Sequence, residues 1–104
     1  MKSYWFVAFK VEFNDKQGIY HLLSGNAVFM FETRSFLPRN AMIILIKFCV
    51  PAEDISGNTM VQIGFFTEID EVGAMDFSPK LSTEGYSILG YETAISPGST
   101  VRVR

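Results

Sequence analysis

Alternating apolar and polar side chains open the chain and predict a β-strand over residues 3–13. One face of this strand should belong to the core, because every second residue on it is large and apolar. Its members are Trp5, Val7, Phe9, Val11 and Phe13. The other face carries Tyr4, Phe6, Ala8, Lys10 and Glu12. The polar segment that follows, residues 14–18, ends in glycine and is typical of a hairpin loop.

A second strand is expected over residues 19–33, pairing with the first as a hairpin. Ser24, Gly25 and Asn26 interrupt its apolar pattern. Such an interruption is typical either of a bulge or kink in one long strand or of a tight turn between two short strands. We favour the bulge or kink, because the apolar pattern resumes at once with Ala27.

The segment before Pro51 fits two structures. Pro38 suits the first position of a helix, and Asn40 and Lys47 are seven residues apart, so they would form one narrow solvent-facing stripe on it. The same segment is rich in β-branched residues, and a strand buried on both faces would have this composition too. We predict a helix near residues 38–50, which the proline ends.

A third strand is predicted over residues 59–70. We expect its core-facing side chains to be Val61, Ile63, Phe65 and Ile69. We expect Gln62, Gly64 and Glu68 to face away. Residues 71–79 are acidic and irregular, with one helical turn as the alternative. The tail contains two shorter strand candidates, residues 86–92 and 100–104, and the second has alternating arginines that would protect a sheet edge.

The order of these elements predicts an α+β fold. Its core is a β-β-α-β unit with an antiparallel sheet, one helix covers one face of that sheet, and a β tail follows. The alternative is an all-β small barrel or sandwich. We expect residues 1–104 to form a single domain, in which residues 80–104 are a C-terminal extension that completes the sheet.

Composition excludes some classes of protein and of partner. Apolar residues make up 48% of the chain and charged residues 19%, which excludes an intrinsically disordered chain. The net charge of −2 makes nucleic acid an unlikely partner, and no apolar run is long enough for a membrane helix. Cys49 is the only cysteine, which fits a reducing compartment, so we expect a cytoplasmic protein. We expect no cofactor, because no glycine motif for phosphate binding is present.

Few residues suggest catalysis. His21 is the only histidine and could act with Glu68 or Asp70 in a small enzyme. A partly buried histidine that is hydrogen-bonded within its strand is the more ordinary interpretation. The two carboxylates, on one face of the third strand, are also weak candidates for a metal site, but their spacing matches no calcium loop. Cys49 lies among apolar residues and should be a core side chain.

Several residues give the chain a resemblance to other proteins. They are the aromatic start Tyr4-Trp5-Phe6-Val7, the hairpin loop that ends at Gly18, and the run Phe65–Ile69. In these features the chain is similar to a group of short proteins from gut Bacteroidetes. Those proteins look like β-β-α-β units with an aromatic first strand and a late Phe-x-Glu-Ile. The resemblance covers residues 3–77 and implies this fold, but no catalytic residue and no activity.

These observations favour a small binding or interaction module without catalytic activity, whose partner is another protein or a second copy joined at a sheet edge. The candidate residues of its interaction surface are Tyr4, Phe6, Lys10, Tyr20 and Phe66. The first alternative is a single-stranded nucleic-acid-binding protein in which aromatic side chains on an open sheet face stack bases. Its candidate residues are Tyr4, Phe6, Tyr20, Lys10 and Arg39. The second alternative is the small enzyme that uses His21.

Overall fold

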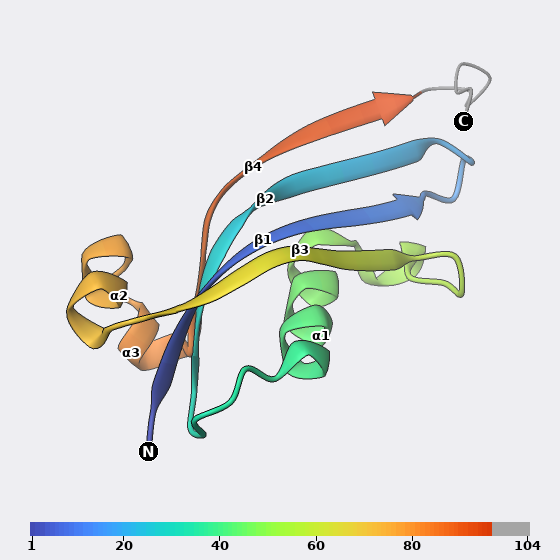
Figure 1. The fold of residues 1–104 in the computed structure, drawn as a ribbon. Coiled ribbons are helices and arrows are strands. Elements are labelled where there is room, and N and C mark those ends of the chain that lie inside the picture. The colour runs from blue at the N-terminus through green and yellow to red at the C-terminus, as the bar shows by residue number, and fades with distance from the viewer. Residues whose placement is uncertain (97–104) are drawn as a thin grey trace.

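The computed structural model describes residues 1–96, with side chains described as far as Ala94. Within this range the chain forms a four-stranded antiparallel sheet with helices on both faces, which confirms the predicted α+β fold (Figure 1). The elements are β1 (Ser3–Asn14), β2 (Tyr20–Phe31), α1 (Pro38–Cys49), a 3-10 turn η1 (Ala52–Asp54), β3 (Met60–Ile69), α2 (Glu71–Phe77), α3 (Leu81–Glu84) and β4 (Tyr86–Ser96). The strand order is β3-β1-β2-β4.

The hairpin of β1 and β2 forms the centre of the sheet. Its register is uninterrupted from the pair Ser3–Phe31 to the pair Asn14–Tyr20. The prediction of one long second strand is therefore confirmed, but the bulge expected in it at residues 24–26 is absent from β2. The irregularities lie in the two outer strands instead, which place one extra residue each against the regular central strands.

Gly64 is the extra residue in β3. The neighbouring residues Ala8 and Phe9 of β1 pair with Phe65 and Ile63, so Gly64 between them has no partner on β1. The extra residue in β4 is Leu89, at the same level of the sheet. Bulges increase the local bend and twist of a strand. The two bulges lie on either side of the row that Ala8 and Asn26 form across the sheet. The whole sheet curves sharply at this level (Figure 1).

The curved sheet has two separate cores. On its concave face α1 covers the apolar side of β1, and Leu45 and Ala41 of the helix are fully buried there with Val7 and Val11. The predicted helix is thus confirmed, and its face with Arg39, Asn40 and Lys47 is exposed to solvent. Pro38 begins the helix, as expected.

The second core lies on the convex face, where α2 and α3 cover one end of the sheet (Figure 1). Its buried members are Tyr4, Val28, Ala74 and Leu81. The prediction of a mainly irregular segment here was wrong. Residues 71–77 form a seven-residue helix, because the Asp70 side chain accepts a hydrogen bond from the Gly73 backbone N–H at 2.7 Å and caps it.

The bulge at Gly64 also corrects the predicted orientation of β3. Val61 and Ile63 face α1, as expected. Beyond the extra residue the alternation shifts, so Phe66 and not Phe65 continues the α1 side, and Ile69 packs in the second core. Phe65 is 54% exposed and is not a core residue.

β4 forms the edge of the sheet beside β2. It begins at Tyr86, as predicted, and runs to Ser96. The predicted strand over residues 100–104 lies outside the described residues. Within residues 1–96, no helix has the length and the apolar character needed to cross a membrane.

Candidate functional site

Two of the candidate surface aromatics lie in the second core. Tyr4 is only 7% exposed, covered by the helix pair α2 and α3. Phe6 is half-buried, and its ring centroid lies 5.7 Å from that of Phe77. The expectation that Tyr4 offers its ring at an open sheet face was therefore wrong. Tyr4 is buried because residues 71–84 fold back over this end of the sheet.

Lys10 and Tyr20 lie on the part of the convex face that no helix covers. The Tyr20 hydroxyl donates a hydrogen bond to Oε1 of Glu12 at 2.8 Å, and Lys10 is exposed. Arg39 lies on α1, which packs against the opposite face of the sheet. The five residues considered for nucleic-acid stacking are thus divided between a core, one open face and the far side of a helix.

His21 contacts neither carboxylate that the sequence suggested. Its Nε2 lies 2.9 Å from Oδ2 of Asp15 in the hairpin loop, and its ring stacks on Phe13 with centroids 4.7 Å apart. In the register of β1, Glu68 lies opposite Trp5, eight residues away from Phe13. That separation is about 26 Å along a strand. The proposed pairing of His21 with Glu68 or Asp70 was therefore wrong.

Asp15 organises the hairpin loop. Its Oδ1 accepts hydrogen bonds from the backbone N–H groups of Gln17 and Ile19, both at 2.9 Å. The hydrogen bond with His21 lowers the pKa of the Asp15 carboxyl, and the backbone hydrogen bonds lower it further. Gly18 has a positive φ of 80° in this loop, which glycine adopts without strain. The histidine and the aspartate thus hold a turn together.

The two acidic residues near the end of β3, Glu68 and Asp70, have different structural roles. Asp70 lies beyond the strand and caps α2, whereas Glu68 is an exposed residue of β3 itself. Residues 1–96 contain no group of three or more His, Cys, Asp or Glu side chains arranged for a metal ion. Cys49 is half-buried at the end of α1, and burial raises the pKa of its thiol to about 11.

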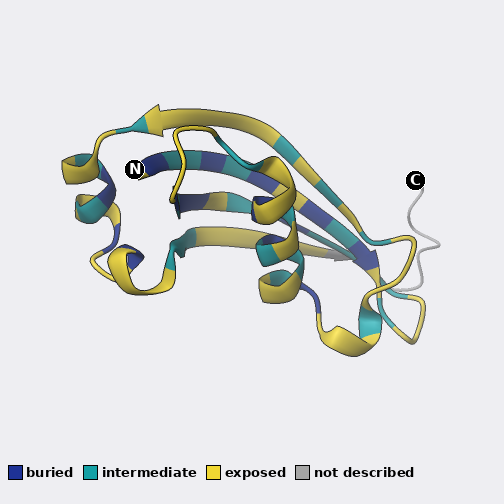
Figure 2. Ribbon diagram, turned by 90° about the horizontal axis from the view of Figure 1, so that it is seen from below, coloured by how far each residue is buried: buried dark blue, intermediate teal, exposed yellow. Residues whose placement is uncertain are grey.

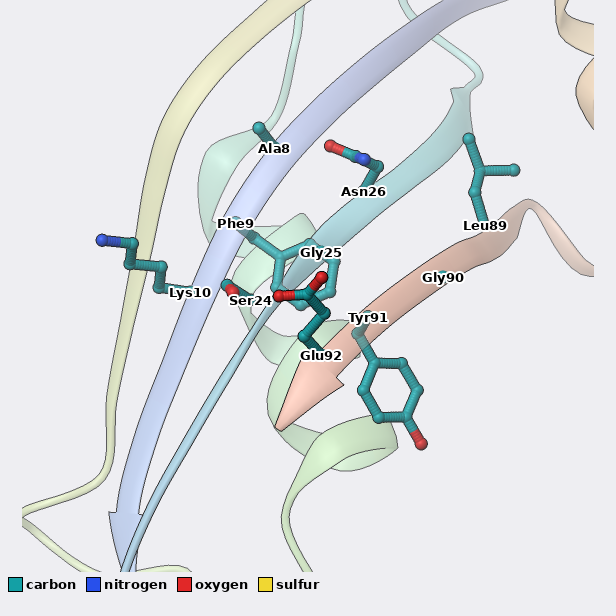
Figure 3. Close-up of a pocket in the computed structure, with 10 residues that line it drawn as sticks. All are labelled: Ala8, Phe9, Lys10, Ser24, Gly25, Asn26, Leu89, Gly90, Tyr91 and Glu92. Atoms are coloured by element: carbon teal, nitrogen blue, oxygen red, sulfur yellow. The ribbon is translucent and has the colours of Figure 1, made fainter. Parts of the chain in front are cut away.

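A shallow depression of about 550 Å³ lies on the convex face at the bend of the sheet (Figure 3). Backbone and small residues form much of its floor, because Gly25 and Gly90 contribute no side chain. Lys10 lies at one margin, the Glu92 side chain extends from β4 toward β2, and Ala8 and Asn26 project from the central strands (Figure 3). It is an open, mainly polar surface with no buried functional group.

The outer edge of β3 is the most distinctive surface of the molecule. Figure 2 shows this strand at one side of the sheet, exposed along most of its length. Three of its large apolar residues are exposed, with Met60 at 59%, Phe65 at 54% and Phe66 at 48%. A long, exposed and apolar edge strand is a surface on which another strand can pair.

Two hydrogen bonds show which backbone groups of β3 point outward. The Asp15 N–H donates to the Ile19 carbonyl, so the odd-numbered residues of β1 bond to β2, because bonding alternates along an antiparallel pair. The bond from the Met30 N–H to the Gly85 carbonyl fits the same alternation on β2. The even-numbered residues of β1 therefore bond to β3.

It follows that the partners of those even-numbered residues direct their own N–H and C=O groups inward, toward β1. The residues of β3 between them direct these groups outward, away from the sheet. The register assigns the outward set as Val61, Ile63, Phe66 and Glu68. No strand among residues 1–96 pairs with this edge.

Aromatic contacts fix the side chains beside this edge. The ring of Phe66 stacks on Phe36 with centroids 4.3 Å apart, and Trp5 lies 5.4 Å from Phe36 and 5.9 Å from Phe66. These contacts hold a half-exposed ring in place at the concave side of β3. Phe65 lies on the other face of the same strand. Any strand added to this edge would therefore contact an aromatic ring on each face.

The edge has few of the features by which proteins protect a free strand. Such features are lysines, prolines, inward-pointing charges and bulges, and of these β3 has only the bulge at Gly64. β3 contains no lysine, arginine or proline, and Glu68 is its only charged residue. The opposite edge, β4, exposes one large apolar side chain among its described residues, Tyr91. The edge of β3 is thus the better candidate for a binding surface.

Of the five residues predicted for an interaction surface, Phe66 alone belongs to this edge. Sequence reasoning missed Phe65 and Met60, which it placed in the core or left unassigned. A signal was present, since an isolated glycine within a strand pattern indicates a bulge, and Gly64 is such a residue. Comparisons with protein-family models, with curated proteins and with solved structures find no match to this chain.

Proposed function

We propose that this protein is a small interaction module without catalytic activity, which binds an extended segment of a protein at the outer edge of β3. The observation that supports the proposal is the outward set of backbone groups, which lies between two half-exposed phenylalanine rings. A strand added to such an edge gains main-chain hydrogen bonds for affinity, and side-chain contacts give specificity.

The energetics favour a reversible contact. Fully burying a phenylalanine side chain stabilises a complex by about 1.5–3 kcal/mol, so the half-exposed rings of Phe65 and Phe66 offer roughly half of this each. Each backbone hydrogen bond adds a net contribution of about 0.5–1.5 kcal/mol. Loss of translational freedom and ordering of the bound segment oppose these gains. We expect binding in the range typical of transient partners.

We propose a cytoplasmic location for this module. The sequence contains a single cysteine, and Cys49 is half-buried with a raised pKa, so its thiol reacts slowly. A chain of this kind needs no oxidising compartment.

Removing one outward backbone N–H group, that of Glu68, tests the proposal. Glu68→Pro removes one outward N–H without removing a bond to β1, and proline is tolerated on the solvent side of an edge strand. Glu68→Gln removes the charge and keeps the N–H, so it is the matched control. Thr67→Pro removes an inward N–H and is expected to destabilise the fold.

The measurement is affinity capture from a lysate of the native host after nuclease treatment, with immobilised wild type and both Glu68 variants. Mass spectrometry quantifies the bound proteins, and circular dichroism establishes that the variants are folded. We expect one or more proteins to bind wild type and Glu68→Gln equally and to be lost with Glu68→Pro. Equal capture by Glu68→Pro, or capture that nuclease removes, would contradict the proposal.

A further inference from the structure

We propose that the strand added to β3 is β3 of a second copy of this chain, antiparallel and related by a two-fold axis. The inference rests on the proposed function, because it names the partner of the same edge. A two-fold interface requires a surface that is complementary to itself. The spacing, the faces and the charge of β3 each meet this requirement.

The spacing of the outward residues is symmetric. From Val61 to Ile63 is two residues, from Ile63 to Phe66 is three because of the bulge, and from Phe66 to Glu68 is two again. The same sequence of intervals results when the strand is read in the reverse direction. Laid antiparallel, a second β3 therefore places Val61 opposite Glu68 and Ile63 opposite Phe66. No other antiparallel register places all four outward residues of one strand opposite outward residues of the other.

This register also preserves the faces of the sheet. Val61, Ile63, Phe66 and Glu68 share the α1 side of β3, so each pair brings together two side chains on the same face. Ile63 then covers the exposed side of Phe66 from the other copy. The two Phe65 rings lie on the convex face on either side of the axis. Both half-exposed aromatic residues lose solvent contact, which is the main apolar gain of the contact.

Charge and space favour the same arrangement. Glu68 is the only charged residue of β3, and the antiparallel register places the two copies of it at opposite ends of the paired strands. A parallel pairing would bring the carboxylates together, and like charges across a strand pair are destabilising. A Cβ atom placed on Gly64, beside the axis, would contact nothing within 4 Å, so the sheet face at Gly64 has room for a side chain of the other copy.

The first experiment measures the molar mass. Sedimentation velocity on wild type, Glu68→Gln and Glu68→Pro across the micromolar range gives the fraction of dimer in each. We expect wild type and Glu68→Gln to dimerise with increasing concentration. We expect Glu68→Pro to remain monomeric at concentrations about tenfold above the wild-type midpoint, a difference equivalent to about 1.4 kcal/mol.

The second experiment tests the register by cysteine crosslinking in a Cys49→Ala background. A tagged Val61→Cys protein is mixed with an untagged Glu68→Cys protein under mild oxidation. Opposed strand residues lie about 5.5 Å apart at Cα, which a disulfide can span. The matched control is Thr67→Cys, one residue away and on the other face. We expect the mixed disulfide with Glu68→Cys to form at least about tenfold faster than with the control.

The outcomes separate this inference from the proposed function. A wild type that stays monomeric, while Glu68→Pro still loses proteins captured from the lysate, overturns the second-copy inference and supports the edge as a binding site for another chain. A dimer that Glu68→Pro leaves intact overturns the inference, because the contact then lies elsewhere. Equal crosslinking of Glu68→Cys and Thr67→Cys overturns the register.

Discussion

The close approach of β4 to Gly25 makes a sharp prediction about stability. A Cβ atom at Gly25 would lie 2.2 Å from the Gly90 carbonyl oxygen and 2.7 Å and 2.8 Å from Cβ and Cα of Tyr91. These neighbours are backbone atoms or a Cβ, so no change of rotamer relieves the contact. Gly25→Ala therefore forces β4 away from β2 by about 1 Å, to ordinary carbon–oxygen separations.

The cost follows from this displacement. Overpacking of a well-packed site lowers the free energy of unfolding by about 1–3 kcal/mol. Alanine also restricts the unfolded chain, which raises the free energy of unfolding by about 0.4–1 kcal/mol. We expect a net loss of about 1–2 kcal/mol in the free energy of unfolding. With a urea m-value of about 1–1.5 kcal/mol/M, the midpoint falls by about 1 M.

Urea unfolding followed by fluorescence of Trp5, the only tryptophan, measures this loss. Gly90→Ala is the matched control, because Gly90 lies in the same part of the sheet and a Cβ there has nothing within 4 Å. We expect its midpoint to be unchanged or slightly raised. A midpoint for Gly25→Ala equal to or above that of Gly90→Ala would refute the reasoning from the close approach.

Three further predictions follow from the core, the hairpin loop and the thiol. Leu45→Ala removes a fully buried side chain and should lower the free energy of unfolding by about 2–5 kcal/mol, whereas Ile43→Ala on the exposed face of α1 should cost far less by the same urea assay. The lowered pKa of Asp15 stabilises the fold above the pKa of the unfolded state, near 3.9, and this gain disappears as pH falls through the lower native value. Asp15→Asn should therefore make the urea midpoint depend less on pH between about pH 5 and pH 2. The same pH dependence in wild type and Asp15→Asn would contradict the assignment. The raised pKa of Cys49, about 11, should make its native reaction with a disulfide reagent at pH 8 at least about tenfold slower than in urea, and equal rates would show an accessible thiolate.

The local elements were predictable because each has a periodic signal. The alternation in residues 3–13 could only be a strand with one apolar face, and β1 buries Val7, Phe9, Val11 and Phe13 as expected. Pro38 and the polar stripe of α1 were sufficient to favour a helix over a strand. These signals arise between residues a few positions apart, so the sequence contains them directly.

The candidate site was only partly predictable. Phe66 was named among the interaction residues, but nothing in the strand pattern showed that β3 forms the sheet edge that gives it a role. His21 was expected to meet carboxylates of β3, and its partner is Asp15, six residues earlier. In both cases the deciding contact depends on which strands lie side by side, and a pattern within one strand does not contain this information.

The sequence by itself determined the strands, the main helix and the α+β class, because hydrophobic periodicity and the prolines act locally. The tertiary structure decided which strand lies at the edge, which side of β3 continues the core after Gly64, and that residues 71–84 cover Tyr4. These features follow from pairing between segments far apart in the chain, where the bulges and the free energy of burying both sheet faces select one arrangement.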